Sequence, residues 1–339
     1  MMKYLTSQDP HFRLKMDELV SASFANPIYH SNHYEFYRCT QNLICLNDYS
    51  AVITDDDGFP ISGLIAKSFI DPVSNKLFLS YFSNPASLMI SALSTVKTIN
   101  DSLDLLKKEI LQNGFVKLLT TSNFDIRVYG HQSNLINSEF LEVILKSAKK
   151  LYVEFERIID LKLPKDQIHQ GISKSVRVAE KQSAKIKTIT QIISSSSNKK
   201  LISESMNNLR TLHLASSGRV TRSSESWTIQ EQQVTDGSII LVNGFIDSKN
   251  IHGSLFLLSN SSAFYGVSAN TMKSEYSISH VFLLEAIYFL KDMGIKNLYL
   301  GQQYENLRGV SDQKILNISR FKSFFGGFLI PNLMIKNEN

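Results

Sequence analysis

Apolar residues recur along the chain with two different spacings. In some segments they stand three or four positions apart, which predicts helices, and in others they form short runs between turn signals, which predicts strands. Asp9 and Pro10 open the first helix. The rest of the first half is predicted to form a helix over 32–39, strands over 43–54, 61–70 and 76–82, a helix over 98–112, a strand over 115–121, a helix over 138–149 and a strand over 151–161. The Asp-Gly turn signal at 55–58 makes the three strands an antiparallel meander.

The second half repeats this order with different residues. Its predicted elements are a strand over 185–193, helices over 199–215 and 225–234, strands over 238–246, 251–258 and 263–269, a helix over 279–293, a strand over 297–300, a helix over 312–324 and a strand over 328–335. The repeated order of helix, helix, three strands, helix, strand, helix, strand is the one found in GNAT-type N-acyltransferase domains. We therefore expect an α/β fold with mixed sheets, in which two tandem GNAT-like domains, 1–165 and 166–339, surround a central cleft.

Composition narrows the class of protein. With 339 residues, 43% hydrophobic and 20% charged, the chain is long enough for two packed domains and is expected to be globular. Its two cysteines, Cys39 and Cys45, are too few for a disulfide scaffold. No apolar run approaches the roughly 18 to 20 residues that cross a bilayer, so we expect a cytoplasmic protein without membrane insertion.

Charge is distributed unevenly between the halves. Residues 1–165 carry 17 basic and 18 acidic side chains, whereas residues 166–339 carry 19 and 13, a net charge of +6. At the junction, 168–183 reads as a basic amphipathic connector helix, with Lys174, Arg177 and Lys181 opposite an apolar face. This pattern favours an anionic partner, although a solvated helix face explains it as well.

Several familiar motifs are absent from the sequence. There is no phosphate-binding loop, dinucleotide fingerprint, His-Glu-x-x-His or Cys-x-x-Cys, which argues against nucleotide hydrolysis, hydride transfer and zinc hydrolysis. His30 and His33 lack a nearby third ligand, so we expect no metal site. The segments 83–97 and 270–280, which follow the two meanders, contain no glycine for a coenzyme-A pyrophosphate loop.

The strongest cluster of polar side chains lies between the first two helices of the second half. It contains two arginines suited to a phosphate or carboxylate, hydroxyls that can read sugar oxygens, and the only tryptophan. A polar loop with a helix N-cap at Ser223 or Ser224 is the structural alternative. The candidate binding residues here are Ser217, Arg219, Arg222, Trp227 and Gln230.

A second cluster precedes the last predicted strand. Three phenylalanines and two glycines surround Lys322 in 321–327, so its ammonium is expected to be partly desolvated and to act strongly on a developing oxyanion. A lysine reaching outward from the end of a core helix is the alternative. Gln302, Gln303 and Tyr304 directly follow the strand over 297–300 and are candidates for positioning an acyl group, or simply form a turn.

These segments carry a resemblance to a known family. The connector 175–186, the helix-Gly294-strand-Gly301 segment 282–301 and the Phe-Lys-x-x-Phe-Gly-Gly sequence 321–327 resemble the Fem-type (FemABX-like) aminoacyl transferases and related acetyltransferase-like proteins of envelope polysaccharide clusters. The resemblance implies two GNAT-like domains that transfer an amino acid from aminoacyl-tRNA to an amine of a peptidoglycan precursor. It also implies that Lys322, with the Phe321 backbone, stabilises charge on the donor carbonyl. The long helical arm of some members is not visible here.

The sequence thus leads to an N-acyltransferase. It would move an aminoacyl or acyl group from an activated donor, with aminoacyl-tRNA favoured over acyl-CoA as co-substrate and no cofactor bound permanently. The acceptor would be an amine of an anionic cell-envelope or nucleotide-sugar precursor. His213, Glu285 and Tyr304 are candidate proton acceptors. The alternatives are an acyl-CoA-dependent N-acetyltransferase of an amino sugar and a non-catalytic RNA- or sugar-binding module.

Overall fold

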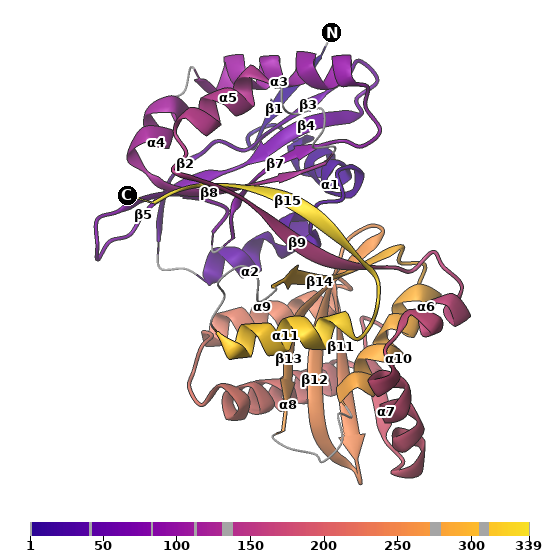
Figure 1. Ribbon diagram of the computed structural model, residues 1–339. Helices are drawn as coiled ribbons and strands as arrows, with labels where there is room; N and C mark the ends of the chain where they lie inside the picture. The colour runs from indigo at the N-terminus through magenta and orange to yellow at the C-terminus, as the bar shows by residue number, and fades with distance from the viewer. Residues whose placement is uncertain are drawn as a thin grey trace. The chain divides into compact units, whose positions relative to one another are not determined.

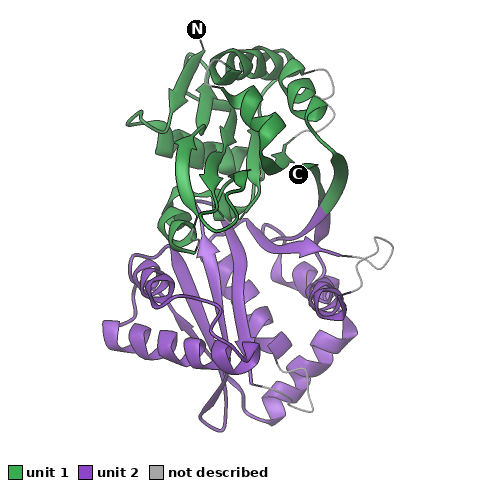
Figure 2. Cartoon of the chain, turned by 90° about the vertical axis from the view of Figure 1, so that its left-hand side faces the viewer, with its two compact units in different colours: residues 1–154, 331–339 green, residues 155–330 purple. Residues whose placement is uncertain are grey.

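The chain folds into two compact units. The computed structural model describes residues 2–40, 43–82, 84–111, 114–130, 138–271, 279–304 and 312–338. Unit 1 comprises residues 1–154 and 331–339, and unit 2 comprises residues 155–330 (Figure 2). The boundary therefore lies at 154/155, earlier than the expected 165/166, and the C-terminal tail belongs to unit 1. Strands β9 (Lys150–Asp160) and β15 (Phe328–Asn337) contribute residues to both units.

Unit 1 is built on a mixed sheet. Its strands run in the order β1 (Lys3–Thr6), β3 (Ala51–Thr54), β4 (Pro60–Ile65), β7 (Ala86–Ile90), β8 (Asn123–Tyr129) and β15. An antiparallel set of β2 (Ile44–Asp48), β5 (Lys67–Ile70) and β6 (Leu77–Ser80) joins at β8. The predicted runs 43–54 and 61–70 are each broken into two strands, and the fully buried β7 was not predicted.

Helices of unit 1 pack on its sheet. The main core lies under α3 (Val96–Leu111), α4 (Phe115–Thr121) and α5 (Glu139–Lys146). Helix α1 (Phe12–Ala22) packs against β3, β4 and β7 and is followed by two 3-10 turns, Pro27–Tyr29 and Ser31–His33, and by α2 (Tyr34–Cys39) (Figure 1). The predicted strand over 115–121 is wrong: Phe115, Leu118 and Leu119 are buried at helical spacing and form α4, and β8 follows it.

Unit 2 contains the remaining strands of the same mixed sheet. Its order is β10 (Ile189–Ile193), β11 (Ile239–Ile246), β12 (Lys249–Leu258), β13 (Ser262–Asn270), β14 (Asn297–Gln303) and the second part of β9. The first four strands form an antiparallel meander, and β14 then pairs parallel with β13 and antiparallel with β9. The meander and the strand that closes on it agree with the sequence prediction.

Helices lie on both faces of the part of the sheet that belongs to unit 2. One core holds α6 (Lys165–Gly171), α7 (Lys174–Lys185) and α10 (Ser279–Asp292). Helix α8 (Lys199–Ser217) packs on β12 and β13 and helix α9 (Ser224–Thr235) packs on β11, while α11 (Gln313–Ser323) lies against β14. The expected single connector helix over 168–183 is two helices, because the chain is extended at Ile172 and Ser173. Within the described residues, no helix is both long and apolar enough to span a bilayer.

Candidate active site

Lys322 approaches the end of β14 from helix α11. Its Nζ donates a hydrogen bond to the carbonyl oxygen of Gln302 at 3.3 Å. Gly301, one residue earlier, has φ +83°, and a Cβ there would lie 3.2 Å from the Lys322 Nζ. The register of β14 against β9 shifts between Tyr299 and Gly301, so the strand bulges where the ammonium meets it. Glycine at 301 therefore serves both the backbone conformation and the close approach of the lysine.

The environment of Lys322 depresses its proton affinity. Burial lowers the pKa of the Lys322 ammonium from 10.5 to about 8, an effect that the negative charge of Glu156 partly opposes. Glu156 lies on β9, is 2% exposed, and is paired in register with Gln302. At neutral pH the ammonium is mostly protonated yet poorly solvated, which is the condition under which a positive charge acts strongly on a neighbouring oxyanion.

The phenylalanines near Lys322 pack around a histidine and not, as expected, around the lysine. Phe321, Phe324 and Phe325 gather around His280 of α10, at ring-centroid distances of 5.1, 5.5 and 5.9 Å. Phe325 is 1% exposed and belongs to the core of unit 2. The phenylalanines therefore anchor the end of α11, and this anchoring fixes where Lys322 emerges.

The two glycines after the phenylalanines allow close backbone contacts. A Cβ at Gly326 would lie 2.6 Å from the Gly171 carbonyl oxygen, and one at Gly327 would lie 2.2 Å from the Ile158 carbonyl oxygen. Both glycines have positive φ. The most specific part of the sequence resemblance is thus explained locally by the turn that joins α11 to β15.

The polar residues at the end of β14, with Tyr304 directly after it, hold α11 in place. Gln303 donates from Nε2 to the Ser319 carbonyl at 2.9 Å and accepts from Arg157 Nε at 3.0 Å. Arg157 also donates to the Gly326 carbonyl at 2.7 Å. The Tyr304 amide donates to Ser319 Oγ at 2.9 Å, and its hydroxyl donates to the Gln302 side chain. Gln303 therefore positions helix α11 against β14.

The two arginines of the polar cluster predicted from the sequence, Arg219 and Arg222, line a separate cavity in unit 2, here called the arginine cavity. About 70 Å³ in volume, it is lined by His213, Arg219, Arg222 and Trp227, together with Arg210 and Leu214 of α8 and the loop residues Val220 and Thr221. The Arg222 guanidinium lies 4.8 Å from the centre of the Trp227 ring and donates to Gln230 Oε1 at 2.8 Å. Arg210 donates to Ser224 Oγ at 3.3 Å. Among the described residues, no acidic side chain lines this cavity, which suits an anionic group.

His213 is kept neutral inside this cavity. Its ring meets the Trp227 ring edge-on at 5.5 Å, and burial, followed by the charges of Arg222 and Lys314, lowers its pKa below 6.5. Ser217 does not line the cavity; its hydroxyl donates to the Arg219 carbonyl at 2.6 Å and closes the turn. Ser223 caps α9 by accepting from the Ser226 amide at 3.1 Å, as the structural alternative had it.

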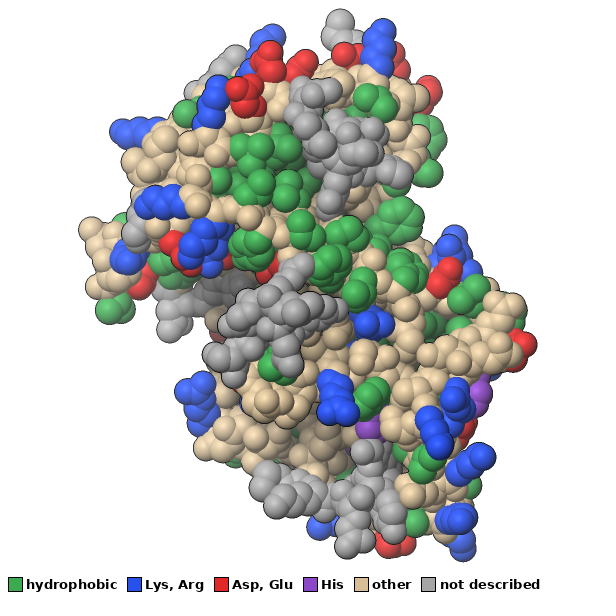
Figure 3. All heavy atoms as spheres, in the orientation of Figure 1, with side chains coloured by type: hydrophobic (Ala, Val, Ile, Leu, Met, Phe, Trp, Pro, Cys, Tyr) green, Lys and Arg blue, Asp and Glu red, His purple; other side chains and the backbone are tan. Residues whose placement is uncertain are grey.

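The remaining candidates lie elsewhere in unit 2. Glu285 is exposed on α10, where its charge, after burial and Glu180, raises the pKa of Tyr288. Lys174 and Lys181 are exposed on α7, and Arg177 is half-buried, with Nη1 donating to the Ile172 carbonyl at 2.7 Å. Figure 3 shows Lys and Arg side chains scattered singly and in small groups over one face of the molecule. The structure thus separates the candidates into the Lys322 group, the arginine cavity and the α7 face.

Three residues of these groups escaped the sequence prediction. Glu156 and Arg157 lie within the predicted strand over 151–161. The signal for them in the sequence was that charged residues stand in a strand whose last residues are apolar. Arg210 stands three residues before His213, so helical spacing already placed the two on one face of α8. Among the described residues, no group of three or more His, Cys, Asp or Glu is arranged to hold a metal ion. Most of the glycine-free segment 270–280 lies outside the described residues.

The comparisons with known proteins bear on the fold. No protein-family model matches the chain, and no curated protein matches it in sequence. Among solved structures, FemX superposes with a TM-score of 0.65 at 10% identity, covering 98% of this chain and 96% of that chain. The chain shares the FemX fold.

Two further structures extend this finding. L-PGS from Bacillus licheniformis matches with a TM-score of 0.56 at 11% identity, covering 98% of this chain and 92% of its own. The C-terminal domain of a putative lysylphosphatidylglycerol synthetase from Agrobacterium fabrum matches with a TM-score of 0.53 at 9% identity, covering 96% and 93%. The Fem-like fold expected from the sequence is confirmed, with two mixed α/β units in one chain.

Proposed function

We propose that this chain is an N-acyltransferase that moves an aminoacyl or acyl group from an activated ester or thioester to an amine of an anionic envelope or nucleotide-sugar precursor. The observation that carries the proposal is the Lys322 ammonium, desolvated and held against the bulged end of β14. The shared fold with FemX and with L-PGS supports it. Envelope precursors and nucleotide-sugars that carry phosphate or carboxylate groups are anionic, and a unit with a net positive charge suits them.

The chemistry follows from a cation placed beside the reacting carbonyl. A neutral amine attacks the carbonyl carbon of the donor, the C–N bond forms, and negative charge develops on the carbonyl oxygen. The Lys322 ammonium stabilises that charge more than it stabilises the neutral carbonyl, so it lowers the barrier. When the C–O or C–S bond of the donor breaks, the leaving oxygen or sulfur takes a proton.

The amine must lose a proton during this reaction. Glu156 is a buried carboxylate close enough to influence the pKa of Lys322, and we assign it the role of proton acceptor ahead of the three residues expected from the sequence. His213 stays neutral and able to accept a proton, but it belongs to the arginine cavity. Glu285 is exposed on α10, and the Tyr304 hydroxyl is engaged by Gln302.

The arginine cavity is assigned to the negative charge of the acceptor. Arg219 and Arg222 supply guanidinium groups, and stacking on Trp227 fixes the plane of Arg222. A planar guanidinium held in this way presents two N–H groups to a phosphate or carboxylate. Gln230, 0% exposed, orients Arg222 from behind.

Aminoacyl-tRNA is the favoured donor, and salt dependence tests it. If the exposed Lys174 and Lys181 of α7 contact phosphates, affinity for charged tRNA should fall by about 0.7 to 0.9 log units per contact for each tenfold rise in salt. Charge reversal at these two lysines should reduce that slope. Tight, salt-insensitive binding of acetyl-CoA with no measurable tRNA affinity would contradict this assignment and favour the acyl-CoA-dependent alternative.

The transfer step is tested by substitution at Lys322. Lys322→Ala should lower turnover by roughly 100- to 1,000-fold, the scale of losing one oxyanion-stabilising donor, while acceptor affinity stays nearly unchanged. Lys200→Ala, at an exposed position near the start of α8, serves as the control. Full activity of folded Lys322→Ala would overturn the role of Lys322.

A further inference from the structure

Arg157 holds together the two chain segments that flank Lys322. Its Nε donates to Gln303 Oε1 at 3.0 Å, at the end of β14, and its Nη1 donates to the Gly326 carbonyl at 2.7 Å, in the turn that joins α11 to β15. The residue itself lies on β9, where it is paired in register with Gly301. A guanidinium is planar and presents its donors in a fixed fork, so this one side chain sets the separation of the two acceptors.

Arg157 also decides how the side-chain amide of Gln303 is oriented. An arginine can only donate hydrogen bonds, so the amide must turn its oxygen toward Arg157. The amide nitrogen then points the other way and donates to the Ser319 carbonyl at 2.9 Å. Ser319 lies in α11 three residues before Lys322, and both Gln303 and Ser319 are buried. The opposite orientation of the amide would set two oxygens against each other, so Arg157 fixes the helix through Gln303.

Lys322 needs such support because its own side chain is flexible. A lysine carries its ammonium on a four-carbon stem, which does not hold one position by itself. The hydrogen bond from Lys322 to the Gln302 carbonyl, at 3.3 Å, is longer than the usual length of about 2.9 to 3.0 Å. The phenylalanines around His280 anchor α11 on the side of α10. Arg157 supplies the anchor on the side of β9 and β14, where the ammonium lies.

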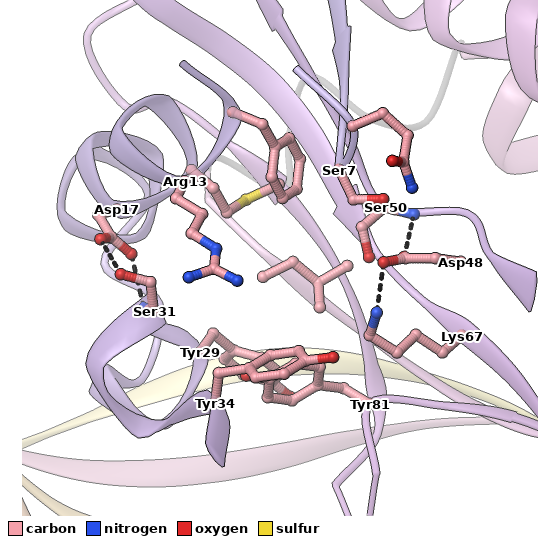
Figure 4. Close-up of a pocket in the computed structure, with 14 residues that line it drawn as sticks. Ser7, Arg13, Asp17, Tyr29, Ser31, Tyr34, Asp48, Ser50, Lys67 and Tyr81 are labelled. Carbon is pink, nitrogen blue, oxygen red and sulfur yellow. Dashed lines mark hydrogen bonds and ion pairs between the residues drawn. The ribbon is translucent and has the colours of Figure 1, made fainter. Parts of the chain in front are cut away.

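Buried cations elsewhere in the chain meet acidic side chains. In unit 1, a cavity of about 180 Å³ has two cationic and two acidic side chains in its lining, Arg13, Lys67, Asp17 and Asp48 (Figure 4). Lys67 forms an ion pair with Asp48 there. Arg157, by contrast, directs two of its N–H groups to neutral oxygens in two different segments. These two contacts fix geometry, and a geometric role predicts that a lysine cannot replace the arginine.

We propose that Arg157 is a positioning residue for the transfer site: its fork holds the end of β14 and the turn after α11 together and so keeps the Lys322 ammonium against the Gln302 carbonyl. All the residues involved belong to unit 2. The value of this arrangement for catalysis rests on the proposed function. The arrangement itself does not, because the environment of Lys322 can be measured without any substrate.

Chemical labelling of Lys322 in the full chain, at a series of pH values, tests this proposal. Acetic anhydride acylates only the neutral amine, so mass spectrometry of the Lys322 peptide gives the pH at which half of the amine is neutral. In the wild type we expect this midpoint near 8, because burial lowers the pKa of Lys322 to about 8. Arg157→Lys keeps the charge but cannot form the fork. Lys322 should then move into water, and its midpoint should rise by about one pH unit or more, a tenfold drop in neutral amine at pH 7.

Arg320→Lys is the matched control. Arg320 is exposed on α11 itself, with its guanidinium carbon 5.9 Å from the centre of the Phe324 ring, and the change again keeps the charge, so the midpoint of Lys322 should stay near 8. Gln303→Met is a second test variant. It is neutral and of similar length but cannot accept from Arg157 or donate to Ser319, so it should raise the midpoint in the same direction.

Two results would overturn the proposal. One is a folded Arg157→Lys or Gln303→Met protein, verified by circular dichroism and thermal unfolding, whose Lys322 midpoint equals that of the wild type. The other is an unchanged kcat of Arg157→Lys when the wild type transfers acyl groups, where we expect a loss of about tenfold or more with the acceptor KM unchanged. A wild type without transfer activity would contradict the proposed function alone, because the labelling result would still show whether Arg157 positions Lys322.

Discussion

Replacing Lys322 by methionine separates what this residue does for stability from what it does for catalysis. Methionine has a similar length and fills much of the same space without a charge. The pKa of Lys322 falls from 10.5 to about 8 on folding because burial disfavours the charged form. The difference of about 2.5 corresponds to at most about 3.5 kcal/mol, at about 1.4 kcal/mol for each pH unit. Because the side chain keeps some exposure, we expect an effect of about 1 to 3 kcal/mol.

The sign of the pH dependence follows from proton binding. As pH rises through about 8, the folded protein releases the Lys322 proton, whereas the unfolded chain keeps it until about 10.5. The unfolded state thus binds more protons in this window, so the free energy of unfolding contributed by Lys322 rises with pH. Lys322→Met lacks this rise and should be the more stable protein at pH 7, with its advantage lost by about pH 10.5.

Urea denaturation at several pH values measures this difference. Comparing the two proteins cancels the titration of all other groups, and Lys314→Met, at an exposed position of α11, should match the wild type throughout. A Lys322→Met protein that is less stable than the wild type at pH 7, or a difference that does not change between pH 7 and 10.5, would refute the assignment of a desolvated ammonium.

Three further predictions test other parts of the site. Gly327→Ala should cost at least about 2 kcal/mol more in urea denaturation than Gly114→Ala, because both glycines have φ +74° but only at 327 would the Cβ clash, 2.2 Å from the Ile158 carbonyl oxygen; equal losses would contradict this. Arg219→Ala should raise the acceptor KM about tenfold with kcat unchanged, since an anion clamp acts equally on ground and transition states; a loss confined to stability would make the loop structural. Glu156→Gln should lower kcat by roughly 100-fold or more without changing donor affinity; unchanged kcat would remove it as the base.

The order of the elements could be predicted because each has a strong local pattern. The meander of unit 2 and helices α8, α9 and α10 have clear periodicity and turn signals, so their predicted bounds agree closely with the structure. The segment 115–121 was misassigned because a short apolar run is compatible with either a strand or a helix. Gly114 with φ +74° begins α4, and the strand follows at Asn123 instead.

The site was predicted only where its residues are close in sequence. His213, Arg219, Arg222 and Trp227 are close in sequence, near the end of α8, in the turn that follows and near the start of α9, so their common cavity could be anticipated. Glu156 and Gln302 are far apart in sequence and become neighbours only through the register of β9 against β14. A local sequence pattern does not predict such a register. The same holds for the unit 1 cavity, where Arg13 and Lys67 come together through the sheet.

The most direct test of the central claim is transfer itself. Purified protein would be incubated with tRNA charged with labelled amino acids, or with acyl-CoA, and an extract of amine-bearing envelope precursors, and the acceptors analysed by mass spectrometry. The account predicts an acceptor that gains one acyl group through an amide with the wild-type protein, at a rate reduced about 100- to 1,000-fold by Lys322→Ala. Equal yields from the two proteins, or no acylated acceptor from any donor, would contradict it.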